Sequence, residues 1–216
     1  MHAELRDASV PAVLRVHRIP HSTNVVRVAL AVAHKGLAVE WVDHDPADRA
    51  AIRALSGQDL VPVMELDGEV VADSSRIVER LERLAPEPPL FPAEPAQRAT
   101  VEVFVEWFDE VWKRPPNQIV AELDSGSPDR GRIAVLAARM AGRQAIFESL
   151  LSGRDHLLGD RFGAADVCAY PFLAYAAGRP PGDDEPFHLV LDEHLSLEGF
   201  PRLAGWLERV GERPVA

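Results

Sequence analysis

The sequence predicts an α/β domain followed by an all-α domain. In residues 13–85, short apolar runs with strand character alternate with amphipathic stretches of helical period. Five prolines then fall within residues 86–95, which excludes both a helix and a central strand there. Beyond them the apolar residues keep helical spacing and no convincing strand pattern appears. We therefore expect a first domain over residues 1–85, a proline-rich linker over 86–95 and an all-helical domain over 96–216.

The first domain is expected to follow the order βαβαββα. The strands should cover about residues 13–19, 39–42, 60–66 and 69–71, and the helices about 22–35, 47–55 and 73–84. Pro46 suits the first turn of the second helix, and Asp67-Gly68 is a hairpin signal. A strand–helix–strand crossover followed by a hairpin and a helix predicts a small sheet covered on both faces.

The second domain is expected to contain three long helices. They should cover about residues 96–113, 129–152 and 164–177. Pro115-Pro116 should bend the first of them or end it before Asn117.

Composition narrows the class of function. The chain has a net charge of −11, whereas nucleic acids and anionic membranes demand a basic footprint, so neither is expected as a partner. The single cysteine, Cys168, excludes an internal disulfide and a paired-cysteine metal site, and no metal is expected. The sequence shows no signal-peptide pattern and no long apolar run, so we expect a cytoplasmic protein.

The segment from Val61-Pro62 to Asp73-Ser74 predicts a binding edge. A proline at the start of a strand fits an edge position, and a cis bond there would turn the backbone of Val61 outward to pair with an extended peptide. Asp73-Ser74 opens a helix, whose free N–H groups and dipole favour a bound carboxylate.

These features, in this order, resemble the cytosolic glutathione transferase family over nearly the whole chain. That family has a thioredoxin-like half, a linker and a helical half. Residues 20–28 (PHSTNVVRV) look like the serine motif of phi-type and related bacterial enzymes, and Ser22 matches the catalytic serine. Val61-Pro62 resembles the family's Val-cis-Pro, which pairs with the cysteinyl part of glutathione. Asp73-Ser74 resembles the pair that holds the γ-glutamyl end.

The resemblance implies a glutathione transferase that joins the glutathione thiolate to a small hydrophobic electrophile, and it implies a homodimer. A thiol is mostly protonated at neutral pH, so a hydroxyl that donates to sulfur at a helix N-terminus would favour the reactive thiolate. Ser22 is the candidate for this role, with Thr23 the lesser one. Ser22 could instead only cap the helix. His21 adjoins the site and is grouped with the electrophile pocket.

Two regions depart from the family pattern. Where phi-type enzymes carry a basic pair for the glycine carboxylate, this chain has Arg49, which either binds that carboxylate or is a solvated surface charge. Gln58 lies in an altered stretch before Val61 and is a further candidate contact to glutathione. These differences leave open another low-molecular-weight thiol as the cofactor.

In the helical half, Phe108 and Trp112 are the expected pocket residues for the electrophile, on an aromatic stripe of which part must be core. Residues 158–166 resemble the family's N-capping box, with Asp166 as its acidic member and Gly163 where a Ser or Thr is usual. Asp166 is therefore expected to stabilise the fold and take no part in the chemistry. Cys168 is expected in the core.

Two other functions share this fold. One is a binding or structural protein that has lost catalysis, because fold does not determine function. The other is an isomerase or dehalogenase that uses the thiol as a cofactor. Disulfide exchange is disfavoured because no cysteine is near Ser22.

Overall fold

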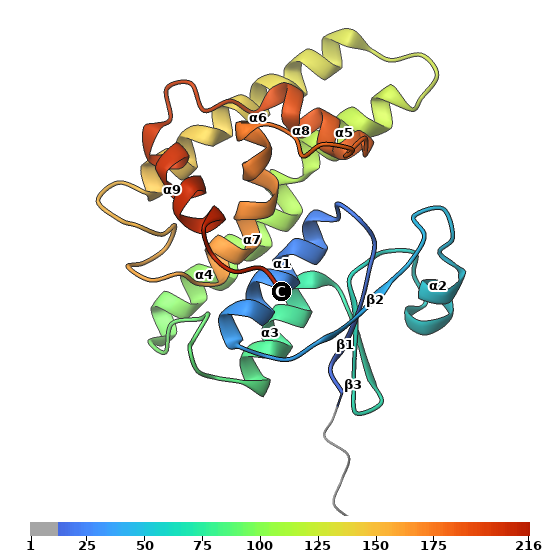
Figure 1. Ribbon diagram of the computed structural model, residues 1–216. Helices are drawn as coiled ribbons and strands as arrows, with labels where there is room; N and C mark the ends of the chain where they lie inside the picture. Colours follow the sequence, from blue (N-terminus) through green and yellow to red (C-terminus); the bar gives the residue numbers. More distant parts are fainter. Residues whose placement is uncertain (1–12) are drawn as a thin grey trace, which may run out of the picture.

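Four short strands form the sheet of the first half. The computed structural model describes residues 13–216 (Figure 1). The strands are β1 (Arg15–Arg18), β2 (Glu40–Asp43), β3 (Val63–Leu66) and β4 (Glu69–Ala72), in the order β2-β1-β3-β4. β1 and β2 are parallel, whereas β3 is antiparallel to both β1 and β4. This confirms the predicted crossover followed by a hairpin.

Three helices cover the sheet: α1 (Thr23–Lys35), α2 (Ala50–Ser56) and α3 (Ser74–Leu84). Figure 1 shows α1 and α3 on the side of the sheet that faces the helical half, with α2 on the other side. α2 begins three residues later than the sequence predicted. The Asp45 and Asp48 carboxylates accept hydrogen bonds from the backbone of Ala47 and Ala50, and these local turns use the residues assigned to its first turn.

All the secondary-structure elements of the second half that are longer than a single bridge are helices or helical turns. They are α4 (Pro95–Trp107), the π-helical turn η1 (Phe108–Trp112), α5 (Arg114–Leu123), α6 (Arg130–Leu150), α7 (Ala164–Leu173), the 3₁₀ turn η2 (Ala174–Ala177), α8 (Pro186–His194) and α9 (Pro201–Gly211). Among residues 13–216, no helix has the length and apolar character to cross a membrane.

Three of these helices were not expected from the sequence. Pro115 and Pro116 occupy the first turn of α5, where a missing N–H costs nothing, so they start a new helix. α8 and α9 likewise begin at prolines, Pro186 and Pro201. A sequence reading that treats proline as a breaker therefore misses all three.

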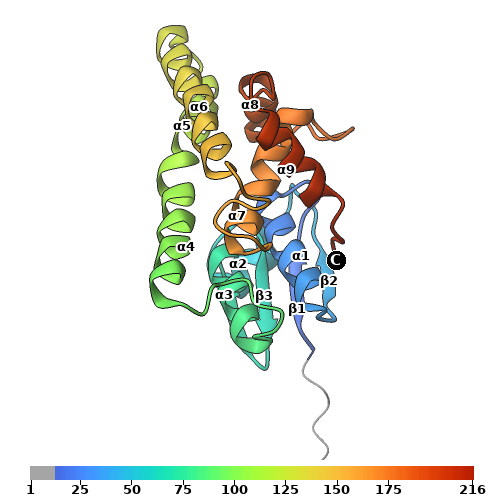
Figure 2. The same cartoon turned by 90° about the vertical axis from the view of Figure 1, so that its left-hand side faces the viewer.

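Helix α7 joins the two halves. Nearly all of its residues are buried, and it packs against α1 of the first half and α4 of the second. Figure 2 shows it between the column formed by α4, α5 and α6 and the pair α8 and α9. One continuous apolar core therefore runs through both halves.

The start of α7 depends on Asp166. Its carboxylate accepts from the backbone N–H of Gly163 (2.9 Å) and Leu157 (3.1 Å) and from the indole N–H of Trp206 (2.7 Å). This confirms that the acidic half of the capping box is kept. Gly163 explains the missing hydroxyl, because a Cβ at this position would lie 2.8 Å from the carbonyl oxygen of Leu90.

Candidate functional site

A pocket of about 260 Å³ lies between the two halves, and we call it the interdomain pocket. The first half lines it with Ile19, Pro20, Ser22, Thr23, Asn24, Arg49, Asp59, Leu60 and Val61, and the helical half with Lys113, Asn117, Phe172, Glu185, Phe187 and His188. It therefore brings together four of the candidate residues from the sequence: Ser22, Thr23, Arg49 and Val61.

Ser22 is the N-cap of α1. Its Oγ accepts from the N–H of Val25 at 3.4 Å, and its carbonyl accepts from Val26 at 3.0 Å. No acceptor for the hydroxyl hydrogen is recorded among residues 13–216, so this hydrogen is available to a ligand. The partial positive charge of the helix N-terminus also attracts an anion to this position. Ser22 can therefore both cap the helix and donate to an anion in the pocket. Thr23 lines the same pocket and is more deeply buried.

At Val61 the backbone has the cis bond on which the predicted binding edge depends, and peptide binding there stays a prediction. The Val61-Pro62 bond is cis, and β3 begins only at Val63, so Val61 lies outside the strand ladder. Arg49 reaches the interdomain pocket, although its Nε donates to the carbonyl of Pro46 at 2.9 Å. Neither Gln58 nor His21 is part of the pocket lining, and His21 is exposed.

Asp73 caps α3 with one carboxylate oxygen. Oδ1 accepts from the N–H groups of both Ser75 (2.9 Å) and Arg76 (3.1 Å). Within the described part of the chain, Oδ2 has no recorded partner. Asp73 also has a φ of 81°, a backbone conformation that Asp tolerates better than most residues. An exposed carboxylate oxygen is therefore held at the start of a helix.

Ser74 is buried and its hydroxyl is already engaged. Its Oγ donates to Oδ1 of Asn24 and accepts from Nη1 of Arg27, each at 3.3 Å. Because the hydroxyl has only one hydrogen, it cannot also donate to a ligand while it binds Asn24. Asp73 already accepts hydrogen bonds from the N–H groups of Ser75 and Arg76. The N–H of Ser74 is therefore the backbone donor at this helix start that is left for a ligand.

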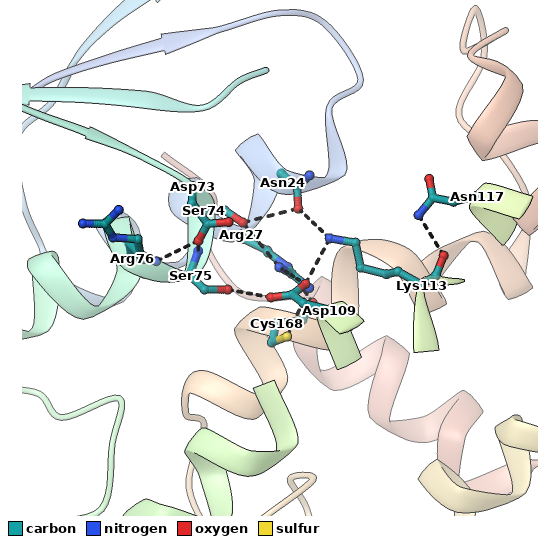
Figure 3. Close-up of polar contacts among 10 residues, drawn as sticks. All are labelled: Asn24, Arg27, Asp73, Ser74, Ser75, Arg76, Asp109, Lys113, Asn117 and Cys168. Atoms are coloured by element: carbon teal, nitrogen blue, oxygen red, sulfur yellow. Dashed lines mark hydrogen bonds and ion pairs between the residues drawn. The ribbon is translucent and has the colours of Figure 1, made fainter. Parts of the chain in front are cut away.

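A buried polar network connects this region with the helical half (Figure 3). Arg27 is 1% exposed, and it binds Asp109 (2.8 Å) and both the carbonyl oxygen and the sulfur of Cys168. Asp109 also accepts from Ser75 (2.8 Å) and from Lys113 (3.0 Å). Side chains from α1 and α3 of the first half therefore meet those of the η1 segment at one carboxylate.

The π turn explains how Asp109 and Lys113 reach this network. The N–H of Lys113 donates to the carbonyl of Phe108 at 3.0 Å, five residues back, which widens the turn. Lys113 then lies over the ring of Phe172 and donates to Asn24 at the pocket wall.

The charges in this network shift each other's pKa values. Burial by itself would raise the pKa of Asp109, but the positive charges of Arg27 and Lys113 outweigh it and hold the pKa below its usual value. Burial lowers the pKa of Lys113, the neighbouring charge of Arg27 adds to this, and Asp109 offsets only part.

The prediction that Phe108 and Trp112 line the electrophile pocket was wrong. Their side chains are 0% and 1% exposed, and their rings stack with centroids 4.4 Å apart inside an aromatic core. The wider π turn directs this part of the stripe inward. The aromatic residues at the interdomain pocket are Phe172, which packs against both, and Phe187.

Cys168 lies in the core, as expected. Burial raises the pKa of its thiol to about 12, which makes it a poor nucleophile at neutral pH. Across residues 13–216, His, Cys, Asp and Glu side chains do not gather in a group that could hold a metal ion.

The sequence analysis missed Asn24, Lys113 and His188 as site residues. Lys113 follows Asp109 by four residues within the aromatic stripe, a spacing that signals a charge pair. His188 lies on α8, which was not expected as a helix. Asn24 was noted only as a capping residue.

A second pocket, of about 430 Å³, lies beside the start of α3. Asp73, Ser75 and Asp109 line it together with carboxylates of α3 and α4. Residues of the buried network line both pockets: Arg27 and Asp109 line this acidic pocket, and Asn24 and Lys113 line the interdomain pocket.

Comparison with known proteins identifies the fold and the family. Residues 16–89 match the model of the glutathione S-transferase N-terminal domain, and residues 145–209 match that of the C-terminal domain. Protein LigF of Sphingobium sp. is 24% identical over 93% of this chain and 90% of its own length. Glutathione S-transferase 3 of Zea mays is 29% identical over 94% of this chain and 91% of its own length.

Solved structures agree. The β-etherase LigF from Sphingobium sp. strain SYK-6 superimposes with a TM-score of 0.78 at 22% identity, covering 93% of this chain and 96% of that one. A glutathione S-transferase from Rhodospirillum rubrum F11 superimposes with a TM-score of 0.73 at 28% identity, covering 93% and 89%. With a thioredoxin-like half, an all-helical half and matches to both family domains, this chain belongs to the cytosolic glutathione transferase family.

Proposed function

We propose that this protein is a glutathione transferase in which Ser22 stabilises the glutathione thiolate for attack on a small hydrophobic electrophile. The observation that carries the proposal is that a single pocket is lined by Ser22, by Val61 before the cis proline and by aromatic side chains of the helical half. A thiolate donor and an apolar acceptor can therefore meet there. Phe172 and Phe187 give the acceptor an apolar surface.

Glutathione has three parts, and each has a counterpart in the proposed site. In this proposal the cysteinyl backbone pairs with Val61, and Arg49, which lines the same pocket, binds the glycine carboxylate. At the other end, the free Oδ2 of Asp73 suits the γ-glutamyl ammonium, and the N–H of Ser74 suits its carboxylate. The hydroxyl of Ser74 plays no direct part, because it is engaged with Asn24.

Replacing Ser22 by alanine is expected to raise the pKa of the bound glutathione thiol by about one unit, equivalent to about 1.4 kcal/mol. The rate of conjugation at neutral pH should then fall about tenfold, because less thiolate is present. The ultraviolet absorbance of the thiolate as a function of pH measures the pKa, and the conjugation rate is measured in parallel.

The matched control is Ser22→Asp, which retains a capping oxygen but lacks the hydroxyl hydrogen. It should lose at least as much activity as Ser22→Ala while keeping more of the stability of α1. If Ser22→Asp retained wild-type activity, Ser22 would be only a cap, and this form of the proposal would be wrong.

Replacing Asp73 by asparagine is expected to weaken glutathione binding by roughly tenfold or more, since a charge-assisted hydrogen bond to the ammonium is lost. Asparagine keeps a capping oxygen and tolerates positive φ, so the fold should be unaffected. Calorimetric titration with reduced glutathione measures the effect, and Asp67→Asn in the exposed hairpin turn is the control. Equal affinity in wild type and Asp73→Asn would show that Asp73 acts only as a cap.

The alternatives from the sequence remain outcomes of these experiments. No saturable binding of glutathione up to millimolar concentration would favour another thiol or a non-catalytic role. Binding and thiolate formation without conjugation would favour an isomerase or dehalogenase. The homodimer stays a prediction from the resemblance, and the cytoplasmic location stays a prediction from the sequence pattern.

A further inference from the structure

A buried Tyr–Asp–His cluster borders the interdomain pocket. Asp183 is fully buried and His188 is 3% exposed. The Nδ1 of His188 lies 2.9 and 3.0 Å from the two carboxylate oxygens of Asp183, and the Tyr175 hydroxyl donates to the same carboxylate at 2.5 Å. The rings of Tyr175 and His188 stack with centroids 4.7 Å apart. These contacts fix the imidazole in one orientation.

The contacts also assign the two ring nitrogens of His188. Asp183 accepts hydrogen bonds, so Nδ1 carries a hydrogen and donates it to the carboxylate. Burial alone would raise the pKa of Asp183, but the hydrogen bonds from Tyr175 and His188 outweigh it, and the pKa lies below its usual value. The ionised carboxylate balances the positive charge that the imidazole has when both nitrogens are protonated. Nε2, which has no recorded protein partner among residues 13–216, is left for the pocket that His188 lines.

We propose that His188, oriented by Asp183, donates a proton from Nε2 to an oxygen of the acceptor substrate in the interdomain pocket. The proposal rests on the proposed function, and it specifies the acceptor class as compounds in which thiolate attack places negative charge on oxygen. An α,β-unsaturated ketone is such an acceptor. Ser22 and His188 line the same small pocket, so one substrate can contact both.

The proton balance of the reaction is simple. The thiolate sulfur bonds to the β-carbon, the π electrons of the C=C bond move to form the enolate, and its oxygen takes the proton from Nε2. Neutral His188 then takes a proton from solvent. This proton replaces the one that the glutathione thiol released to solvent when it became a thiolate. The enol relaxes to the ketone thioether. Lys113, at the same pocket, supplies a second positive charge near the developing anion.

Two electrophiles test this role. Benzylideneacetone is an unsaturated ketone whose adduct needs a proton on oxygen. Benzyl chloride releases chloride by direct displacement and places no charge on oxygen. His188→Gln retains a similar polar shape but cannot donate a proton. It should lower kcat/KM for benzylideneacetone about 100-fold and lower the value for benzyl chloride by a much smaller factor, because that reaction needs no proton on oxygen. Asp183→Asn should shift the same ratio in the same direction, by less.

The control is His194→Gln, on the same helix and outside the pocket lining, which should leave both rates unchanged. Calorimetry with reduced glutathione checks that each variant binds the thiol. A parallel fall for both electrophiles, or no fall for either, in variants that bind glutathione would overturn the role of His188. If wild type bound glutathione but converted neither electrophile, the proposed function and the role of His188 would fail together.

Discussion

Replacing Asp166 by alanine should lower the free energy of unfolding by about 4 kcal/mol, because two buried donors and one half-buried donor lose their acceptor at once. The donors belong to the loop before α7, to α7's own N-terminus and to Trp206 of α9. Trp206 is 0% exposed, so no water can replace the lost acceptor without repacking. The loss should therefore loosen α7, on which both halves pack.

Urea unfolding followed by tryptophan fluorescence measures this effect. The matched control is Asp160→Ala, an exposed aspartate in the same loop, which should change stability by less than about 0.5 kcal/mol. At a temperature where the variant is still folded, its affinity for glutathione should match that of wild type. A destabilisation of under 1 kcal/mol would mean that the cap contributes little to the fold.

Replacing Asp109 by alanine should cost about 3 kcal/mol of stability, because it leaves the buried guanidinium of Arg27 without its counter-charge. Lys113 would then face Arg27 with no carboxylate between them, and these like charges repel. The consequence should appear at the contact between the halves, since Arg27 comes from the first half and Asp109 from the second. Glu110→Ala, at the adjacent exposed position, is the control.

The ion pair between Arg27 and Asp109 should also make the free energy of unfolding depend on pH in acidic solution. The pKa of Asp109 is lower in the folded protein than in the unfolded chain, so its contribution is complete above the unfolded value, about 3.9, and is lost as the pH falls toward the folded value. The stability difference between wild type and Asp109→Ala should therefore shrink below about pH 4. A difference that stayed constant from pH 6 to pH 3 would exclude this ion pair as the cause.

The parts of the fold and of the candidate site that follow from local sequence patterns, or from the family resemblance, could be predicted. Ser22 was identified because residues 20–28 resemble the family's serine motif, whereas the capping pattern by itself predicts only a helix cap. The Val61-Pro62 edge was identified because a proline at the start of a strand needs an explanation. Asp73-Ser74 was identified because it opens a helix, whose N-terminus favours a bound carboxylate, and because it resembles the family's pair of an acidic residue and a serine.

What depends on packing between the halves could not be predicted. The sequence shows an aromatic stripe, but the π turn decides that Phe108 and Trp112 face the core and that Lys113 reaches the pocket. Similarly, Asp183 and His188 become neighbours only through a loop and a helix that begin beside prolines, where sequence patterns are weakest. The role of a side chain in such a pocket depends on contacts between residues that are distant in sequence. Such contacts have no fixed spacing from which they could be predicted.

Cys168 is the chain's single thiol, and its sulfur accepts a hydrogen bond from Arg27 across the contact between the halves. Because Cys168 is only 3% exposed, at the wall of the acidic pocket, a maleimide or oxidised glutathione should react with it much faster once the two halves separate or α7 unfolds. The amount of singly labelled protein seen by mass spectrometry therefore measures how often the molecule opens. The labelling rate of Cys168 therefore reports on opening without an added label site. The same reaction can be used to compare how often wild type and each of the variants described above open.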